Sequence, residues 1–225
     1  MSDLIRYEKA FYVGADAIQS AQLQASLIMD LFGNDPRNLN QFDRNDDGII
    51  QTIILKGQQG HQDAEARTKF VIDTLIGNNY KVEVLEVAIA NFDQQEGYEK
   101  MLALIDLYAD TMEVVISNND AMAIGAIQAL LEKGLIEDIN EDGIIDQSSE
   151  PWIPVVGIDG LDPALELIRS GHMYGTIKND SQEMANIMLE LAMWILQEKS
   201  LHDFPHEIEN GQYVWVDYKK LSINE

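Results

Sequence analysis

The sequence predicts an α/β fold in which a Rossmann-like parallel sheet is flanked by helices. Short apolar runs rich in Val and Ile recur along the chain, and such runs are typical of strands buried on both faces. Stretches with helical periodicity separate these runs. Because repeated strand–helix units place successive strands parallel, with helices on the sheet faces, the alternation predicts a sheet covered on both sides.

The expected elements alternate along the whole chain. Apolar runs such as Thr-Ile-Ile-Leu at 52–55 and Val-Val-Ile-Ser at 114–117 mark the strands. The strands are expected at 10–13, 51–55, 82–87, 113–117, 154–158 and 173–177, with a last short one at 213–216. The helices are expected between them, at 17–31, 63–75, 94–108, 121–133, 162–170 and 182–198.

Two acidic loops interrupt this scheme where strands begin. Residues 43–51 and 138–146 both follow the pattern D-x-N-x-D-G-I-I-[QD], the front half of an EF-hand calcium loop. Oxygens at alternate positions of such a loop point inward, and its glycine permits the turn that wraps them round a hard cation. The bidentate Glu that ends an EF-hand loop is missing, because its position holds Ile54 in one copy and Ser149 in the other. Each loop is therefore either an incomplete calcium site, which needs another carboxylate, or an ordinary acidic turn before a strand.

The composition narrows the classes of partner. The 225 residues include 15 basic and 39 acidic ones, which gives a formal net charge of -24, and Lys and Arg form no cluster. Such a charge argues against nucleic acid and anionic membrane surfaces as partners. The absence of cysteine excludes disulfides, thiolate metal sites and cysteine nucleophiles. No apolar run is long enough to span a membrane, and the first residues are polar, so we expect neither a membrane span nor a signal peptide in this chain.

Polar side chains follow the expected strands at their carboxyl ends, where ligands bind in open α/β sheets. These segments contain His, Asp, Arg, Asn and one aromatic ring, and they lie at 60–67, 91–93, 118–120, 159 and 179–180. Planar polar groups can bridge adjacent hydroxyls of a sugar, while an aromatic ring covers its apolar face. Taken singly, the same residues suit helix caps, turns and surface charges. Their arrival at successive strand ends favours a site for a neutral polyol.

Several stretches resemble one family closely. They are Phe-Tyr-Val-Gly-Ala-Asp at 11–16, the segment 47–57, Gly-His-Gln-Asp-Ala-Glu-Ala-Arg-Thr at 60–68, the segment 113–123, and Pro-Val-Val-Gly-Ile-Asp at 154–159. From about residue 7 onward, the chain resembles the bacterial periplasmic galactose/glucose-binding proteins, which serve ABC transporters and chemotaxis and have the type 1 periplasmic binding protein fold. The resemblance implies two hinged lobes with a hexose held between them.

The resemblance also implies how this chain divides. Residues 10–178 would form the C-terminal sugar-binding lobe with its calcium loop. Residues 179–210 would belong to an N-terminal lobe whose remaining segments lie outside the chain, and 211–225 would be a return strand and tail. With one wall of the clamp missing, we expect an incomplete fragment that binds sugar weakly. The apolar helix at 182–198 should then fold back on its own sheet, pair with a second copy as a homodimer, or drive aggregation.

Residue by residue, the resemblance implies a set of ligands. The sugar would contact His61, Asp63, Arg67, Asn119, Asp159 and Asn179, with Phe92 at the position of a stacking tryptophan. Calcium, the expected cofactor, would bind Asp43, Asn45, Asp47, the carbonyl of Ile49, Gln51 and, from a distant strand, Glu113. The resemblance is silent on the second loop, where a weaker site would use Asp138, Asn140, Asp142, Ile144 and Asp146.

The expected function is therefore non-enzymatic binding of galactose or glucose, with structural calcium, in the periplasm or at the outer cell surface. An ABC permease or a chemoreceptor would be the protein partner. An enzyme that uses His61, Asp63 and Arg67 as acid–base groups is disfavoured, because no phosphate loop, nucleophile elbow or catalytic metal triad is present. A repressor's sugar-sensing effector domain and a calcium-stabilised interaction module without sugar binding remain alternatives.

Overall fold

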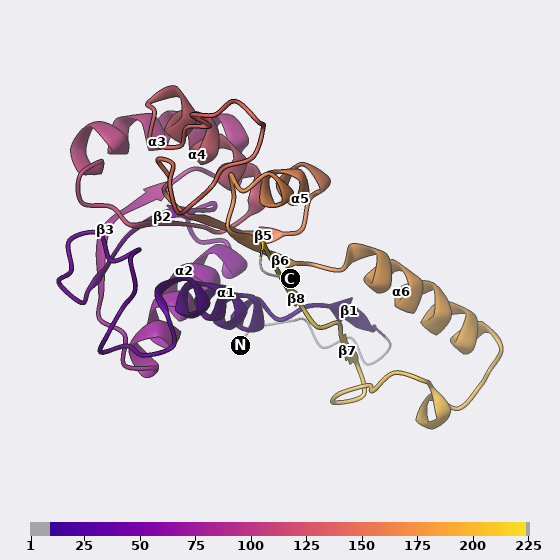
Figure 1. The fold of residues 1–225 in the computed structure, drawn as a ribbon. Coiled ribbons are helices and arrows are strands. Elements are labelled where there is room, and N and C mark those ends of the chain that lie inside the picture. Colours follow the sequence, from indigo (N-terminus) through magenta and orange to yellow (C-terminus); the bar gives the residue numbers. More distant parts are fainter. Residues whose placement is uncertain (1–9, 224–225) are drawn as a thin grey trace.

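The computed structural model describes residues 10–223, which form two sheets (Figure 1). The larger sheet has six strands in the order β3-β2-β4-β5-β6-β8, all parallel except β8, which runs antiparallel to β6. The smaller sheet consists of β1 and β7 in parallel. The strands are β1 Tyr12–Gly14, β2 Ile50–Lys56, β3 Val82–Ile89, β4 Val114–Ser117, β5 Val155–Asp159, β6 Gly175–Lys178, β7 Tyr213–Trp215 and β8 Lys219–Ser222.

The helices lie between the strands, as the sequence predicted. They are α1 Ala17–Phe32, α2 Gln62–Gly77, α3 Gln94–Tyr108, α4 Asp120–Glu132, α5 Asp162–Arg169 and α6 Ser181–Leu196, with a short 3-10 helix η1 at Leu201–Asp203. The predicted fold class, a Rossmann-like sheet flanked by helices, is confirmed. Two elements were not predicted, namely η1 and β8. No helix within residues 10–223 combines the length and the apolar character that a membrane crossing requires.

The core of the large sheet has two layers, because alternate residues of a strand face opposite sides. Ile54 and Ile116 pack with α1 and α2 on one face, where Leu27 and Val71 are buried. Their chain neighbours Ile53 and Val115 face α3 and α4 on the other side. This alternation explains why the central strands contain short apolar runs that are buried on both faces.

Helix α6 extends away from the large sheet and lies beside β1 and β7 (Figure 1). Its buried residues Ile187 and Leu191 cluster with Val214 and other side chains of the small sheet. The opposite face of α6 leaves Leu189 and Leu196 exposed, at 66% and 78%. The helix thus packs one face on a small sheet that the chain itself provides, while pairing with a second copy stays a prediction.

Candidate functional site

The amino end of α2 carries three of the predicted sugar ligands. His61 is the N-cap, and its Nδ1 accepts a hydrogen bond from the backbone N–H of Asp63 at 3.2 Å. Arg67 lies one helical turn after Asp63, with its Nη2 3.9 Å from the Asp63 Oδ2. Because α2 starts at the carboxyl end of β2, these side chains project over the edge where ligands bind in such sheets.

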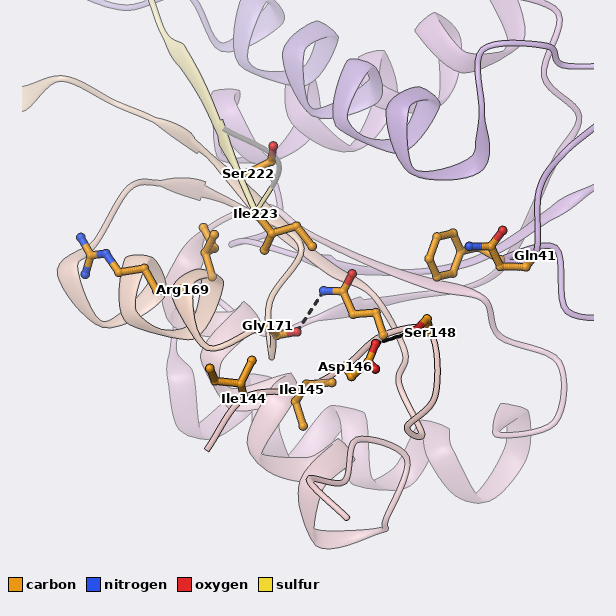
Figure 2. A pocket seen from close by; sticks show the side chains of 12 residues that line it. Gln41, Ile144, Ile145, Asp146, Ser148, Arg169, Gly171, Ser222 and Ile223 are labelled. Carbon is orange, nitrogen blue, oxygen red and sulfur yellow. Dashed lines mark hydrogen bonds between the residues drawn. The ribbon is translucent and has the colours of Figure 1, made fainter. Parts of the chain in front are cut away.

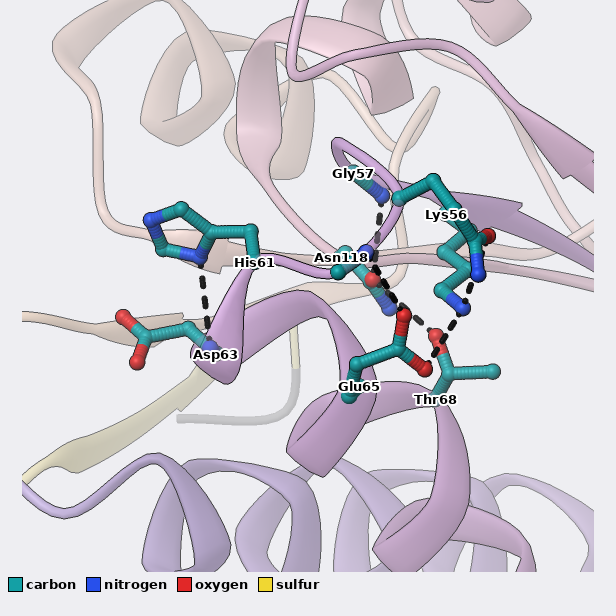
Figure 3. A network of polar contacts seen from close by, with 9 residues as sticks. Lys56, Gly57, His61, Asp63, Glu65, Thr68 and Asn118 are labelled. Carbon is teal, nitrogen blue, oxygen red and sulfur yellow. Dashed lines mark hydrogen bonds and ion pairs between the residues drawn. The ribbon is translucent and has the colours of Figure 1, made fainter. Parts of the chain in front are cut away.

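A polar network holds the loop that leads into α2 (Figure 3). The carboxylate of Glu65 accepts hydrogen bonds from Lys56 Nζ at 2.7 Å and from the Gly60 N–H at 2.9 Å. The contacts with Lys56 and Gly60 lower the pKa of Glu65, so the carboxylate stays ionised. On the other side, Asn118 Oδ1 accepts from the N–H of Gly57 at 3.1 Å. The position of His61 therefore depends on a loop that is fixed at both ends.

Phe92 provides the aromatic face, but its geometry differs from a free stacking platform. Its ring lies edge-on to that of His61, with 5.2 Å between ring centroids. Its φ of 64° falls in the left-handed region, which costs a bulky residue strain and often marks a functional position. The ring also covers Gly57 so closely that a Cβ there would lie 2.1 Å from the Phe92 Cζ. Because Gly57 has no side chain, the Phe92 ring can lie directly against it.

Asn119 has the capping role that the sequence allowed, while its contact with a sugar stays a prediction. Its Oδ1 caps α4 by accepting from the Met122 N–H at 3.0 Å, and its Nδ2 donates to the carbonyl of Phe92 at 3.2 Å. The amide therefore joins the Phe92 turn to the end of β4. A sugar hydroxyl would have to share this amide with the cap.

Arg67 is buried to 4% exposure, and its guanidinium is held from two sides. Its Nη1 donates to the carbonyl of Asn118 at 2.8 Å, and its Nη2 donates to the hydroxyl of Tyr218 at 3.1 Å. Its Nε is buried without a hydrogen-bond partner within the described residues. Tyr218 was missed by the sequence analysis, because it lies 151 positions away and follows no recognisable motif.

Asp159 and Asn179 follow neighbouring strands and meet at the same edge. The N–H of Asn179 donates to the carbonyl of Asp159 at 2.9 Å. Burial raises the pKa of Asp159 to about 6, an increase that Asp120 and Asp63 reinforce and Arg67 opposes. Asn179 Oδ1 is buried and has no partner in the part of the chain that the structure describes. Asp159 itself has a φ of 133°, an unusual conformation for a residue with a side chain.

Buried Asp120 holds the turn that carries Asp159. Its carboxylate accepts hydrogen bonds from the Gly160 N–H at 2.7 Å, the Leu161 N–H at 2.9 Å and the Thr176 hydroxyl at 2.6 Å. Burial nevertheless raises the pKa of Asp120, while these hydrogen bonds oppose the shift. The sequence pattern placed Asp120 in a polar segment after a strand, whereas in the structure its carboxylate supports the turn at Gly160.

A second residue that the sequence analysis missed is Tyr12. Burial raises its pKa, and the negative charges of Asp63 and Asp16 raise it further, so its hydroxyl lies within the electrostatic field of Asp63. Its ring contacts that of Trp215 at a centroid distance of 5.5 Å. The small sheet therefore borders the predicted sugar residues with an aromatic surface. Tyr12 lies in β1 and Trp215 in β7, and these strands pair only in the tertiary structure, so no local sequence pattern connects the two rings.

The first acidic loop is curled by its own side chains. Asp43 accepts hydrogen bonds from the N–H groups of Asp47 and Gly48, at 3.2 and 2.9 Å. Asn45 Oδ1 accepts from the Asp47 N–H at 3.0 Å, and Asp47 Oδ1 accepts from the Ile49 N–H at 2.8 Å. These contacts place the predicted ligands on the inside of one turn.

Glu113 reaches this loop from the strand beside β2, as the resemblance implied. Its two oxygens accept from the backbone N–H groups of Arg44 at 2.6 Å and Gln51 at 3.2 Å. Burial raises the pKa of Glu113 to about 7, and the charges of Asp43 and Asp47 contribute. Gln51 Oε1 is buried and unpartnered as far as residues 10–223 show. No group of three or more His, Cys, Asp or Glu side chains among these residues meets the geometry of a metal site.

The second acidic loop repeats the geometry of the first. Asp138 accepts from the N–H groups of Asp142 and Gly143 at 3.2 and 2.7 Å, and Asn140 Oδ1 accepts from Asp142 at 2.9 Å. Asp142 Oδ1 accepts from the Ile144 N–H at 2.9 Å.

Glu150 takes the place in the second loop that Glu113 takes in the first. Its Oε1 accepts from the N–H of Ile139 at 2.9 Å, and its Oε2 accepts from the N–H of Asp146 at 2.7 Å. The sequence indicates no obvious remote carboxylate for this loop, although Glu150 is adjacent to it in the chain. The hydroxyls of Ser148 and Ser149 instead donate hydrogen bonds to the carboxylate of Asp146, and these bonds lower the pKa of Asp146.

An open cavity of about 570 Å³ lies at the opposite edge of the large sheet (Figure 2). It is bordered by Gln147 and Ile145 of the second loop, by Gly171 before β6, and by Ile223 after β8. The Gln147 side chain donates to the Gly171 carbonyl across its wall. This cavity lies at the amino ends of the parallel strands, so it is separate from the predicted sugar residues.

Comparison with known proteins places this geometry in a family. Residues 2–200 match the model of the periplasmic binding protein domain. The chain is 36% identical over 195 residues to the D-galactose/methyl-galactoside binding periplasmic protein of Haemophilus influenzae, covering 86% of this chain and 53% of that protein. It is 30% identical over 134 residues to a xylitol-binding protein of Mycolicibacterium smegmatis, covering 59% of this chain and 34% of that protein.

Solved structures of the same fold superpose on most of the chain. A solute binding protein from Actinobacillus succinogenes with bound D-allose has a TM-score of 0.72 at 20% identity, covering 95% of this chain and 61% of its own. One from Bacillus halodurans with bound myo-inositol has a TM-score of 0.71 at 22% identity, with the same coverage. The chain spans about half the length of the galactoside-binding relative. On the match of its first 200 residues, the chain belongs to the periplasmic binding protein domain family.

Proposed function

We propose that this chain binds a monosaccharide, galactose or glucose, as a non-enzymatic component of ABC transport in the periplasm. One observation carries the proposal. Two predicted sugar ligands at the carboxyl edge of the sheet, Arg67 and Asn179, each hold a buried polar atom that no described residue satisfies. A buried polar group without a partner is costly, and a ligand hydroxyl is the kind of group that would remove the cost.

The charges and shapes at this edge suit a neutral polyol. The Arg67 Nε can donate to a hydroxyl oxygen, while Asn179 Oδ1 and the carboxylates of Asp63 and Asp159 can accept from hydroxyl hydrogens. Phe92 lies beside these groups and can cover the apolar face of a sugar ring. The names of the galactoside-binding and xylitol-binding relatives support a polyol as the ligand class.

We propose a low affinity, because the predicted sugar ligands among the described residues all lie at one edge of the large sheet, which encloses a sugar from one side. Hydrogen bonds that remain open to water contribute little net free energy. Binding should be millimolar, against micromolar or tighter for a complete clamp, a loss of about 4 kcal/mol.

Sugar binding is tested by NMR on 15N-labelled protein. Galactose, glucose and, as a control, a non-sugar osmolyte are titrated in turn, and the amide chemical shifts are followed. Asp159→Asn and Asn179→Ala should weaken any galactose or glucose response, whereas Asp73→Asn, an exposed change on the far end of α2, should not. Equal, unsaturable shifts with all three additives would refute sugar binding. An ABC permease or a chemoreceptor is the protein partner that we propose.

We further propose that the first acidic loop binds structural calcium. Gln51 Oε1 and the buried carboxylate of Glu113 offer oxygens inside the turn that Asp43, Asn45 and Asp47 form. Burial raises the pKa of Glu113, and the charges of Asp43 and Asp47 add to the shift, so a cation there would offset the cost of holding these carboxylates together. Calorimetric titration of chelator-treated protein with calcium tests this, and Glu113→Gln should remove most of the heat of binding.

A calcium-stabilised interaction module without sugar binding is the second candidate. The observation that favours it is the exposed apolar face of α6, with Leu189 and Leu196 open to solvent. The sugar titration separates the two candidates, because only the first requires saturable shifts at the residues of the sheet edge.

A further inference from the structure

Tyr218 lies where the chain crosses from the small sheet to the large one. It follows β7 and immediately precedes β8, and its side chain is buried to 6% exposure. Helix α1 holds this crossover with one side chain, because Gln19 Oε1 accepts from the Tyr218 N–H at 2.9 Å and Gln19 Nε2 donates to Asp217 Oδ1 at 2.7 Å. The backbone of Tyr218 is therefore fixed independently of the sugar residues.

The hydroxyl of Tyr218 is one of two groups that orient the guanidinium of Arg67. It accepts from Nη2 at 3.1 Å, while the Asn118 carbonyl accepts from Nη1 at 2.8 Å. The remaining Nη2 contact, to Asp63, is 3.9 Å long and too long for a hydrogen bond. A planar guanidinium held at both terminal nitrogens has one orientation, and this orientation leaves Nε without a partner among the residues described.

The electrostatic surroundings agree with this arrangement. Burial raises the pKa of Tyr218, Arg67 opposes the shift, and the charges of Asp63 and Asp159 reinforce it. The hydroxyl thus lies within the field of three predicted sugar ligands and stays protonated. A neutral hydroxyl can accept from Arg67 and still donate its own proton to an acceptor at this edge.

We propose that Tyr218 is a positioning residue of the sugar site, whose hydroxyl orients the Arg67 guanidinium so that Nε is presented to a ligand hydroxyl. The proposal rests on the proposed function of this edge as a monosaccharide site. Tyr218 acts through Arg67, so its effect on the ligand should vanish when Arg67 can no longer form the same pair of hydrogen bonds.

Tyr80 offers a matched control. It is also buried, at 5% exposure, and its hydroxyl donates to the Gly33 carbonyl at 2.6 Å. Tyr80 precedes the start of β3, so it lies at the amino ends of the strands. Tyr218→Phe and Tyr80→Phe each remove one buried hydroxyl, so both should lower the melting temperature by a similar few degrees. Only Tyr218→Phe should weaken galactose or glucose binding, by about tenfold as expected for one lost orienting hydrogen bond.

The test measures sugar titrations by NMR in wild type, Tyr218→Phe, Tyr80→Phe, Arg67→Lys and the Tyr218→Phe/Arg67→Lys double variant. The proposal expects Tyr218→Phe to add no further loss in the Arg67→Lys background. It is overturned if Tyr218→Phe binds as wild type does, if Tyr80→Phe weakens binding equally, or if the two losses at 218 and 67 are additive.

A second readout needs no sugar and separates this proposal from the proposed function. The Arg67 Nε–H resonance should be sharp and protected from solvent exchange in wild type and in Tyr80→Phe, and broadened in Tyr218→Phe. Without any sugar response in wild type, the proposed function fails, and this resonance alone decides the orienting role. An unchanged resonance in Tyr218→Phe refutes that role.

Discussion

Replacing Asp120 by Ala should destabilise the protein strongly, because one carboxylate satisfies three donors. The Gly160 and Leu161 N–H groups and the Thr176 hydroxyl all donate to it at 2.9 Å or less, and the carboxylate is fully buried. An unsatisfied buried donor costs about 1–3 kcal/mol. Since the Thr176 hydroxyl can rotate to another acceptor, and the N–H groups of Gly160 and Leu161 are only partly buried, these two stranded donors set the expected loss at about 2–4 kcal/mol.

The surroundings limit relaxation at this site. A Cβ on Gly157 would lie 2.2 Å from Asp120 Oδ1, so the strand passes close to the carboxylate and cannot move inward to fill its place without disturbing β5. Asp120→Asn keeps the shape, and its amide can direct the oxygen to the two backbone donors and its NH₂ group to the Thr176 hydroxyl. Its loss should be about 1 kcal/mol.

Urea unfolding followed by circular dichroism measures both free energies. Asp106→Ala, which removes an exposed carboxylate paired with Lys133 on the surface, is the control and should cost less than about 1 kcal/mol. If Asp120→Ala unfolds at the same urea concentration as Asp106→Ala, then the turn at Gly160 does not depend on this carboxylate, and the reasoning is refuted.

Further predictions concern calcium, pH and α6. Calcium at a hundredfold excess over its Kd should raise the free energy of unfolding by about 2.7 kcal/mol, and Glu113→Gln should abolish most of that gain. If neither chelator nor Glu113→Gln changes the melting temperature, the first loop is only a turn. The loop at 138–146 should bind calcium more weakly than the first, because it is more exposed, and tight occupancy of two sites by metal analysis would contradict that ranking. Because burial raises the folded pKa of Asp159 to about 6, above the ordinary 3.8, its folded form binds more protons between these values, so the contribution of Asp159 to the free energy of unfolding should fall by roughly 2 kcal/mol as pH rises from 4 to 6. Asp159→Asn should lose this fall, whereas identical pH profiles for the two proteins would argue against the shift. Leu196→Lys, which places a charge on the exposed face of α6, should reduce self-association in sedimentation experiments, and a wild-type protein that stays monomeric at high concentration would refute association through this face.

Local patterns predicted much of the candidate site. Strand ends are short-range features, so the polar residues after β2, β4 and β5 could be located from periodicity alone. The parallel arrangement then predicts that these ends meet at one edge. His61 and Asp63 lie there together with Phe92, Asp159 and Asn179, as the structure shows, while their contacts with a sugar stay a prediction.

Other parts of the site depend on residues that sequence patterns do not connect. Glu150 follows the second loop closely in sequence, yet only the folded turn shows that its carboxylate occupies the same place as that of Glu113. Strand β8 was not predicted, because a short stretch that begins with two lysines lacks the apolar run of a buried strand and pairs only as an antiparallel edge. Tyr12 likewise comes within the electrostatic field of Asp63 only because β1 pairs with β7 outside the large sheet.

The sequence by itself determined the fold class, the two curled acidic loops and the presence of helix α2, because side-chain period, glycine placement and capping act over a few residues. The tertiary structure alone decided the pairing of β1 with β7, the face of α6 that stays exposed, and the contact between Tyr218 and Arg67. The physical reason is range: a hydrogen bond between residues 151 positions apart has no local signature, and it forms only after packing of the sheet and helices has brought both partners to the same edge.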